Sequence, residues 1–176
     1  FSDTTHDMVL LGAYDSTTSF YKLSYNQYNV SKPIVSFSAN TERTPVEAGV
    51  LNEKTLFDIT YDKLLVNNKQ VQGKTGTTSP SSTLYLFGLN NNRTFKKPFY
   101  GRIYSCAIYE GSELIAMFRP AIRKTDNYVG MYDTIHKVFY ENAGTGTFAA
   151  GQHSVGSDFG MIVDISNIAI SDMTLT

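Results

Sequence analysis

The sequence is a succession of short apolar or alternating segments separated by turns, and none of them has the periodicity of an amphipathic helix. Residues 19–25 alternate with a period of two, whereas residues 84–88 form a short apolar run. Such patterns are typical of half-buried and fully buried strands. Between segments, Asn67-Asn68 and the Glu110-Gly111-Ser112 stretch supply residues that suit tight turns. We therefore predict an all-β fold, a jelly-roll β-sandwich of two antiparallel sheets.

The composition agrees with this class. The chain has 12 Tyr, 11 Phe and no Trp, and only 18% of its positions are charged. Tyrosine and phenylalanine are enriched in strands because they pack well on a pleated, half-buried surface. We expect a core that contains the following apolar side chains: Leu10, Phe37, Leu86, Ile103, Ile108, Phe118, Tyr132 and Phe139.

Charge and cysteine content exclude several classes of protein. The 15 basic and 16 acidic residues give a net charge of −1, so we expect no nucleic-acid partner. Cys106 is the only cysteine, which excludes an intramolecular disulfide and a cysteine-ligated zinc site. No apolar run approaches the roughly 20 residues that cross a bilayer, so we expect no membrane insertion. The opening residues, Phe1-Ser2-Asp3, predict a processed chain or an excised piece of a longer one.

The sequence changes in character after Gly151. Residues 152–160 are polar and rich in glycine, and we interpret them as a linker. Residues 161–166 and 168–170 are apolar and β-branched, which predicts one or two further strands. The predicted organisation is one domain over residues 1–151, followed by a linker and C-terminal strands over 152–176.

An ordered set of motifs in the second half of the chain resembles a known family. The motifs are GRIYS at 101–105, FRPA at 118–121, VGMYD at 129–133 and NAGTGTF at 142–148. Together they look like the closing half of a LamG-like, concanavalin A-like lectin-glucanase domain. The first half agrees more loosely, and the similarity covers about residues 8–151. Domains of this family are common in bacteriophage tail proteins, other virion structural proteins and bacterial surface proteins.

The resemblance implies a setting and a role. It implies a module on a virion or a bacterial cell surface, extracellular, that serves attachment to a glycan or host-surface receptor, or virion assembly. Other virion subunits or further copies of the chain would then be partners, in a homo-oligomer or a larger assembly. The alternative is a purely structural or oligomerisation module without a glycan ligand, and a glycoside hydrolase is the third reading.

One departure from the family has a structural consequence. The family usually opens with an extra strand, and only residues 1–7 precede Met8 here. A missing strand leaves an open sheet edge that invites pairing. We expect the C-terminal strands to cover such an edge in their own domain or in a neighbouring copy, unless they begin a further module.

Catalytic and metal-binding patterns are weak. Glycoside hydrolysis needs two carboxylates about 5 Å apart on the same face, and the closest pairs, Asp58 with Asp62 and Glu110 with Glu113, flank turns. We therefore predict that the protein is not an enzyme and that it has no cofactor. Calcium at the loop rim stays open, with Asp126-Asn127 or Asp133 as oxygen donors, although turn-forming roles are favoured for all three.

Candidate ligand-binding residues are tyrosines that can stack on a sugar and polar side chains in the loops beside them. The residues that meet this description are Tyr25, Asn26, Tyr28, Asn90, Asn91, Asn92, Arg93 and Tyr100. They form one site only if the loops 26–31 and 90–97 meet in space. The Ser/Thr/Gly loop at 73–82 is a further candidate for the rim of that site.

Overall fold

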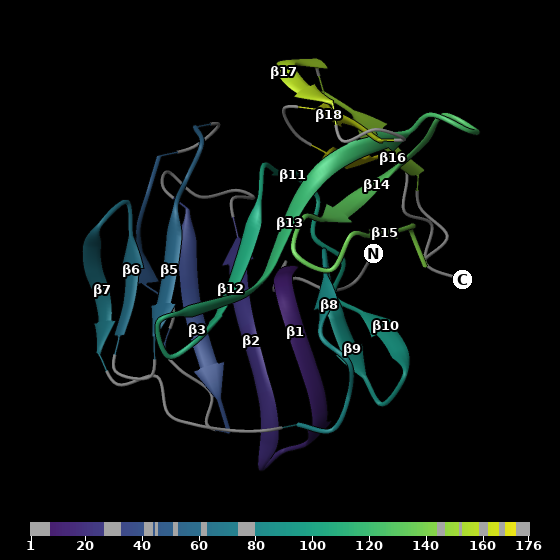
Figure 1. Cartoon of the computed structure of the whole chain (residues 1–176). Helices are drawn as coiled ribbons and strands as arrows, with labels where there is room; N and C mark the ends of the chain where they lie inside the picture. Colours follow the sequence, from purple (N-terminus) through teal and green to yellow (C-terminus); the bar gives the residue numbers. More distant parts are fainter. Residues whose placement is uncertain are drawn as a thin grey trace. The chain divides into compact units, whose positions relative to one another are not determined.

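The structure is a computed structural model of the 176-residue chain, and it is all-β. It describes residues 8–26, 33–40, 44, 46–50, 53–60, 63–73, 80–143, 147–151, 153–158, 162–165 and 168–171. These residues contain strands and turns but no helix, and so no helix of the length and apolarity that a membrane crossing requires. The chain divides into two compact units, Phe1–Phe99 and Tyr100–Thr176 (Figure 1).

The first unit contains a seven-stranded and a three-stranded sheet. In the larger sheet the strand order is β10-β9-β1-β2-β3-β4, with β8 also paired to β1. Its strands are β1 (Met8–Ser16), β2 (Ser19–Asn26), β3 (Ile34–Ala39), β4 (Val46–Glu47), β8 (Tyr85–Leu86), β9 (Leu89–Asn91) and β10 (Thr94–Lys96). The smaller sheet is the meander β5 (Phe57–Thr60), β6 (Lys63–Val66) and β7 (Lys69–Gly73). All these pairings are antiparallel except the short one between β1 and β9.

The core of the first unit joins its two sheets. The ring of Tyr25 on β2 makes edge contacts with Phe57 on β5 and with Phe99, at centroid distances of 5.9 and 5.8 Å. Leu23 and Leu64, one from each sheet, are fully buried. Two apolar sheet faces that bury such side chains against each other are typical of a β-sandwich.

The second unit also contains two sheets. One has the order β15-β14-β13-β18-β17, with β12 also paired to β13, and the other has the order β11-β19-β16. The strands of the first are β12 (Cys106–Glu110), β13 (Glu113–Arg123), β14 (Tyr128–Asp133), β15 (Val138–Tyr140), β17 (His153–Asp158) and β18 (Ile162–Ile165). Those of the second are β11 (Arg102–Ile103), β16 (Thr147–Ala150) and β19 (Ile168–Ser171).

Tight turns form where the sequence predicts them. Asn67 and Asn68 have φ values of 50° and 66°, which makes the β6–β7 connection a type I′ turn. The β12–β13 hairpin forms as well, but its loop has two residues instead of three because Glu110 pairs directly with Glu113. Asparagine and glycine adopt positive φ at low steric cost, so these turns follow from local sequence.

Pro120 lies inside a strand, since β13 runs from Glu113 to Arg123. The pairing of β13 with β12 stops at Phe118, and its pairing with β18 starts at Ala121. On this side of β13, Pro120 lies between the two ladders, so its missing N–H removes no hydrogen bond to β12 or β18. On the other side it pairs with Met131 of β14. A proline is therefore tolerated inside this long strand.

The C-terminal segment belongs to the second unit. The structure has β17 in most of the stretch for which a linker was expected, and its end residues His153 and Asp158 pair with Ile165 and Val163 of β18. In turn β18 pairs with β13, and β19 lies between β11 and β16. In this structure the tail strands thus complete sheets of their own chain.

The expected core residues divide into two groups. Ile103 and Tyr132 are buried, with 7% and 8% of their surface exposed. The other six are half-buried: Leu10, Phe37, Leu86, Ile108, Phe118 and Phe139. Because the strands are distributed over four sheets in two units, most of these side chains lie near the margin of a small core instead of at its centre.

Candidate functional site

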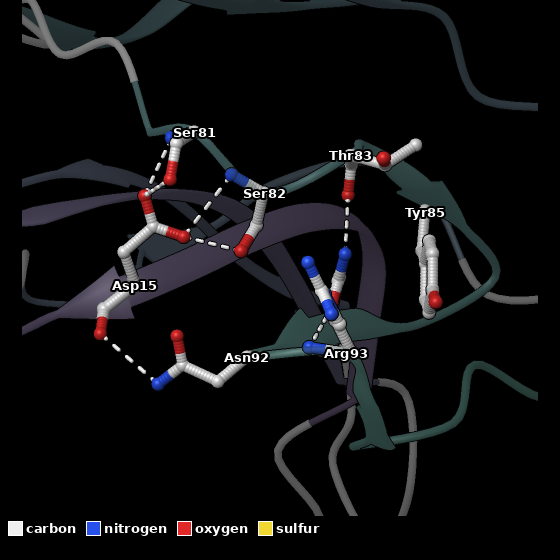
Figure 2. A pocket seen from close by; sticks show the side chains of 8 residues that line it. Asp15, Ser81, Ser82, Thr83, Tyr85, Asn92 and Arg93 are labelled. Carbon is white, nitrogen blue, oxygen red and sulfur yellow. Dashed lines mark hydrogen bonds between the residues drawn. The ribbon is translucent and has the colours of Figure 1, made fainter.

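A cavity of about 390 Å³ lies in the first unit beside the β9–β10 hairpin (Figure 2). Three segments that are distant in sequence meet there: the end of β1, the stretch that leads into β8, and the hairpin. The residues that line it are Asp15, Ser81, Ser82, Thr83, Tyr85, Asn90, Asn92 and Arg93. The lining is mostly polar, with Tyr85 as its aromatic member.

Asp15 joins the end of β1 to a segment 66 residues further along the chain. One carboxylate oxygen accepts hydrogen bonds from the amide and hydroxyl of Ser81, and the other accepts them from the amide and hydroxyl of Ser82. The Ser82 hydroxyl contributes most to lowering the pKa of Asp15, against an opposing effect of partial burial. Four donors fill the acceptor capacity of a carboxylate, so Asp15 acts as an anchor for the cavity wall.

Asn90 holds a second part of the wall. Its side chain is buried, and its Nδ2 donates to the carbonyl oxygen of Thr83 at 2.8 Å. Its Oδ1 accepts from the backbone amide of Arg93, also at 2.8 Å. Both ends of the amide group are thereby used to position the segment before β8 and the hairpin turn.

The hairpin turn is built from Asn92 and Arg93. Their φ values of 48° and 67° are those of a type I′ turn. The turn is tied to β1, since the Asn92 backbone amide donates to the carbonyl oxygen of Tyr14, and its Nδ2 to that of Asp15, each at 3.1 Å. Among the described residues, no hydrogen bond or ion pair is found for the exposed Arg93 guanidinium.

Tyr85 provides a flat aromatic wall. Its ring stacks on that of Phe95 with a centroid distance of 6.3 Å and an interplanar angle of 27°. Gly88 makes room for this pair, because a Cβ at that position would lie 2.3 Å from the Phe95 ring. With one face supported by Phe95, the rest of the Tyr85 ring is held in place to line the cavity.

The structure brings some of the predicted site residues together. Asn90, Asn92 and Arg93 line the cavity, whereas Asn91 pairs with Thr94 within the hairpin and is not part of the lining. Tyr25 is a core residue with 7% of its surface exposed, so its ring face is not available at a rim.

The other predicted site residues lie elsewhere. Asn26 ends β2, where it pairs with Ile34, and Tyr28 lies outside the described residues. Tyr100 is 37% exposed and belongs to the second unit.

Sequence reasoning missed Asp15, Thr83 and Tyr85 as lining residues. Ser81 and Ser82 fall in the loop that was named as a candidate rim, although no role was assigned to either. Nothing in the local pattern around Asp15 distinguishes it from a solvated turn residue. Only its hydrogen-bond partners, Ser81 and Ser82 from a distant segment, distinguish Asp15 from such a residue.

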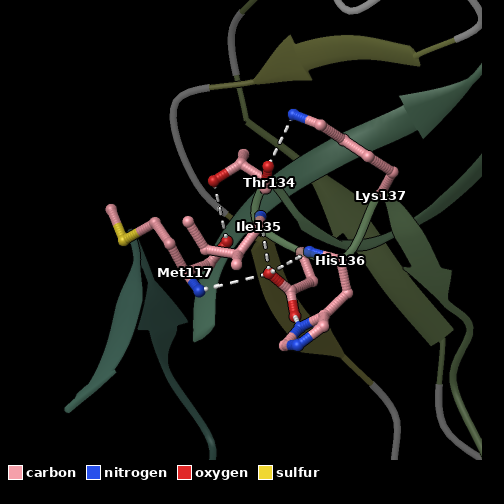
Figure 3. Close-up of polar contacts among 6 residues, drawn as sticks. Met117, Thr134, Ile135, His136 and Lys137 are labelled. Carbon is pink, nitrogen blue, oxygen red and sulfur yellow. Dashed lines mark hydrogen bonds and ion pairs between the residues drawn. The ribbon is translucent and has the colours of Figure 1, made fainter. Parts of the chain in front are cut away.

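The two carboxylates considered for calcium, Asp126 and Asp133, already have protein partners, and Asn127 adopts a positive φ of 58°. The Asp126 carboxylate accepts from Arg123 Nε at 3.0 and 3.2 Å and from the Tyr128 amide at 3.2 Å. The Asp133 carboxylate accepts from the backbone amides of Met117 and Ile135, and its second oxygen lies 2.6 Å from His136 Nδ1. Figure 3 shows how Met117, Ile135 and His136 are arranged. These are turn-forming roles, as favoured from sequence. Within the described part of the chain, no three His, Cys, Asp or Glu side chains are grouped as a metal site would require.

The groups considered for catalysis are placed as follows. Glu110 and Glu113 are paired across the β12–β13 turn and are both exposed. Asp58 is exposed on β5, and Asp62 lies outside the described residues. Burial raises the pKa of the Cys106 thiol to about 11, so it is protonated near neutral pH and unsuited to nucleophilic attack.

Comparison with known proteins identifies no relative. No protein-family model, no curated protein and no solved structure matches this chain. The geometry of the cavity is therefore the basis for a functional conclusion.

Proposed function

We propose that this protein is a non-catalytic attachment module that binds a glycan in the cavity beside the β9–β10 hairpin. The observation that carries the proposal is the combination of a supported aromatic ring, Tyr85, with the amide of Asn92 and the guanidinium of Arg93 around one open cavity. A sugar ring presents an apolar C–H face and a rim of hydroxyl groups. The C–H face packs on an aromatic ring, and the hydroxyl groups exchange hydrogen bonds with planar polar groups.

The rigidity of the cavity wall supports this proposal. Asp15 and Asn90 use their hydrogen bonds to hold Ser81, Ser82, Thr83 and the hairpin in place. A site whose walls are positioned in advance loses less conformational entropy when it binds a ligand. Its size also falls in the range of cavities that hold small ligands such as one or two sugar units.

The proposed setting is a virion or a bacterial cell surface, where a host-surface glycan would be the receptor. The resemblance to LamG-like virion proteins and the β-sandwich architecture support this setting, and the jelly-roll topology is part of the same proposal. The absence of catalysis is proposed because the exposed Glu110–Glu113 pair lies at a turn, while the cavity's one carboxylate, Asp15, is committed to Ser81 and Ser82.

A glycan array tests the proposal. The whole chain is expected to bind a subset of glycans weakly, and Tyr85→Ala should abolish that binding while leaving the far-UV spectrum unchanged. The matched control is Tyr109→Ala, which removes a tyrosine that is 60% exposed and does not line the cavity. If no glycan binds, or if Tyr109→Ala is as damaging as Tyr85→Ala, glycan binding at this cavity is wrong.

A structural or oligomerisation module is the second candidate function. It is favoured by the exposed apolar side chains of the second unit: Tyr109, Ile115, Tyr128, Ile135, Val138 and Tyr140. Exposed apolar side chains mark a contact between chains when they form a contiguous patch. Sedimentation velocity distinguishes the candidates, because a structural module should self-associate and lose that property in a Tyr109→Ser/Tyr140→Ser variant.

A further inference from the structure

The charged and buried polar side chains of the cavity differ in how far their hydrogen-bonding capacity is already used. Asp15 already accepts four hydrogen bonds, and both ends of the Asn90 amide are engaged. The Arg93 guanidinium has five N–H donors and, within the described structure, no hydrogen-bonded or ionic partner. A ligand group that contacts Arg93 must therefore supply acceptors, because a guanidinium only donates.

Arg93 also occupies a backbone position that does not suit it. At the second central position of a type I′ turn, glycine is preferred, because a side chain at φ 67° brings its Cβ close to the following carbonyl oxygen. The first central residue, Asn92, is of a favoured type for this turn. Lys97 and Lys137 also have positive φ, but of these three basic residues only Arg93 lines the cavity.

The two charged side chains of the cavity lie among different neighbours. In Figure 2, Asp15 lies beside Ser81 and Ser82, and Arg93 is drawn between this group and Tyr85. In the described part of the chain, Asp15 forms no ion pair with Arg93 and accepts hydrogen bonds from Ser81 and Ser82. An anionic group of a ligand can therefore approach the Arg93 end of the cavity, next to the aromatic ring.

From these three observations we propose that the glycan is acidic, and that Arg93 binds the carboxylate of a sugar acid whose ring packs on Tyr85. A planar guanidinium and a planar carboxylate form two parallel hydrogen bonds, which combine charge neutralisation with orientation. This inference rests on the proposed glycan-binding function and adds the chemical class of the ligand.

Matched pairs of acidic and neutral saccharides test the inference by titration calorimetry. Suitable probes are oligogalacturonate with its carboxyl-reduced counterpart, and sialyllactose with lactose. The wild-type chain is expected to bind at least one acidic member roughly 10- to 100-fold more tightly than its neutral partner, as for a charge-assisted hydrogen-bonded pair. Arg93→Gln should remove that preference, and Arg93→Lys should keep only part of it, because lysine cannot form the two-pronged contact.

Two further variants separate binding from folding and from general electrostatics. Arg93→Gly should lose the preference for the acidic saccharide although it relaxes the turn, so its thermal midpoint should be equal to or higher than that of the wild type. Lys96→Gln removes one positive charge from the same hairpin, at an exposed position outside the cavity lining, and should leave the preference intact.

The outcomes distinguish this inference from the proposed function. If neutral and acidic members bind equally and Tyr85→Ala abolishes both, the cavity is a glycan site and the acidic specificity is wrong. If Lys96→Gln lowers the affinity for acidic members as much as Arg93→Gln, the attraction is nonspecific and the Arg93 site is wrong. If no saccharide binds, both the inference and the proposed function are wrong.

Discussion

At the scale of single residues, Asp133 shows how a buried carboxylate organises a turn. It is 1% exposed, and it accepts hydrogen bonds from the Met117, Ile135 and His136 backbone amides. Burial acts to raise its pKa, but the hydrogen bonds from the His136 side chain and from these amides outweigh it, so the pKa of Asp133 lies below its ordinary value. The folded protein therefore favours the ionised form of this carboxyl.

The pH dependence of stability should reflect this shift. Because the folded-state pKa is lower than the unfolded one, the contribution of Asp133 is fully present above about pH 4 and is lost as the pH falls further. Asp133→Asn should lower the free energy of unfolding at pH 7 by about 1–3 kcal/mol and should flatten its decline in acid. Urea denaturation between about pH 3 and pH 7, a range that includes the titration of carboxyl groups, measures the free energy of unfolding and its decline in acid. An unchanged acid profile in the variant would contradict this role.

At the scale of elements, the side chain of Gln72 on β7 occupies the edge of a neighbouring strand. Its Oε1 accepts from the Phe37 amide at 3.1 Å, and its Nε2 donates to the Phe37 carbonyl oxygen at 2.6 Å. These are the two backbone groups that the short strand β4 does not reach, since β4 pairs only with Ile34 and Val35. The glutamine thus satisfies an edge that would otherwise offer itself to another chain.

Gln72→Ala should therefore destabilise the first unit by about 1–3 kcal/mol, because two half-buried backbone groups lose their partner. Chemical denaturation provides the measurement, and light scattering reports any aggregation through the opened edge. Gln70→Ala is the matched control, since Gln70 is exposed on the same strand. Equal effects of the two substitutions would mean that the contact with Phe37 contributes nothing specific.

At the scale of the whole molecule, the strand pairings separate into two sets. All pairings of β1 to β10 lie within Phe1–Phe99, and all those of β11 to β19 lie within Tyr100–Thr176. The tail is integral to the second set, because Ile168 on β19 is fully buried. Each unit thus has its own sheets and buried residues, which is the usual condition for separate cooperative unfolding.

Differential scanning calorimetry should accordingly show two transitions. Ile168→Ala creates a cavity in the second unit and should lower one transition by about 10 °C or more, while leaving the other in place. Gln72→Ala should shift the other transition. A single transition that both substitutions lower would show instead that the chain unfolds as one domain. Ile115→Ala, at a residue that is 37% exposed, should have little effect on either transition.

The sequence by itself determined the strand class and several of its turns. The positive φ values at Asn67 and Asn68 and the hairpin around Gly111 depend on local sterics, which neighbouring residues specify. The Asn90–Arg93 stretch could be named as a candidate for binding from its polar side chains alone, and three of its four members line the cavity.

Only the tertiary structure decided which strands are neighbours, and with that the rest of the site. A strand presents the same backbone donors and acceptors to every partner, so alternation along one segment does not encode what lies beside it. Three features depend on which strands become neighbours. They are the contact of Asp15 with Ser81 and Ser82, the pairing of β18 with β13, and the burial of Tyr25 between Phe57 and Phe99. The cavity exists because packing brought residues from distant segments together, whereas the turns exist because each is favoured by its own sequence.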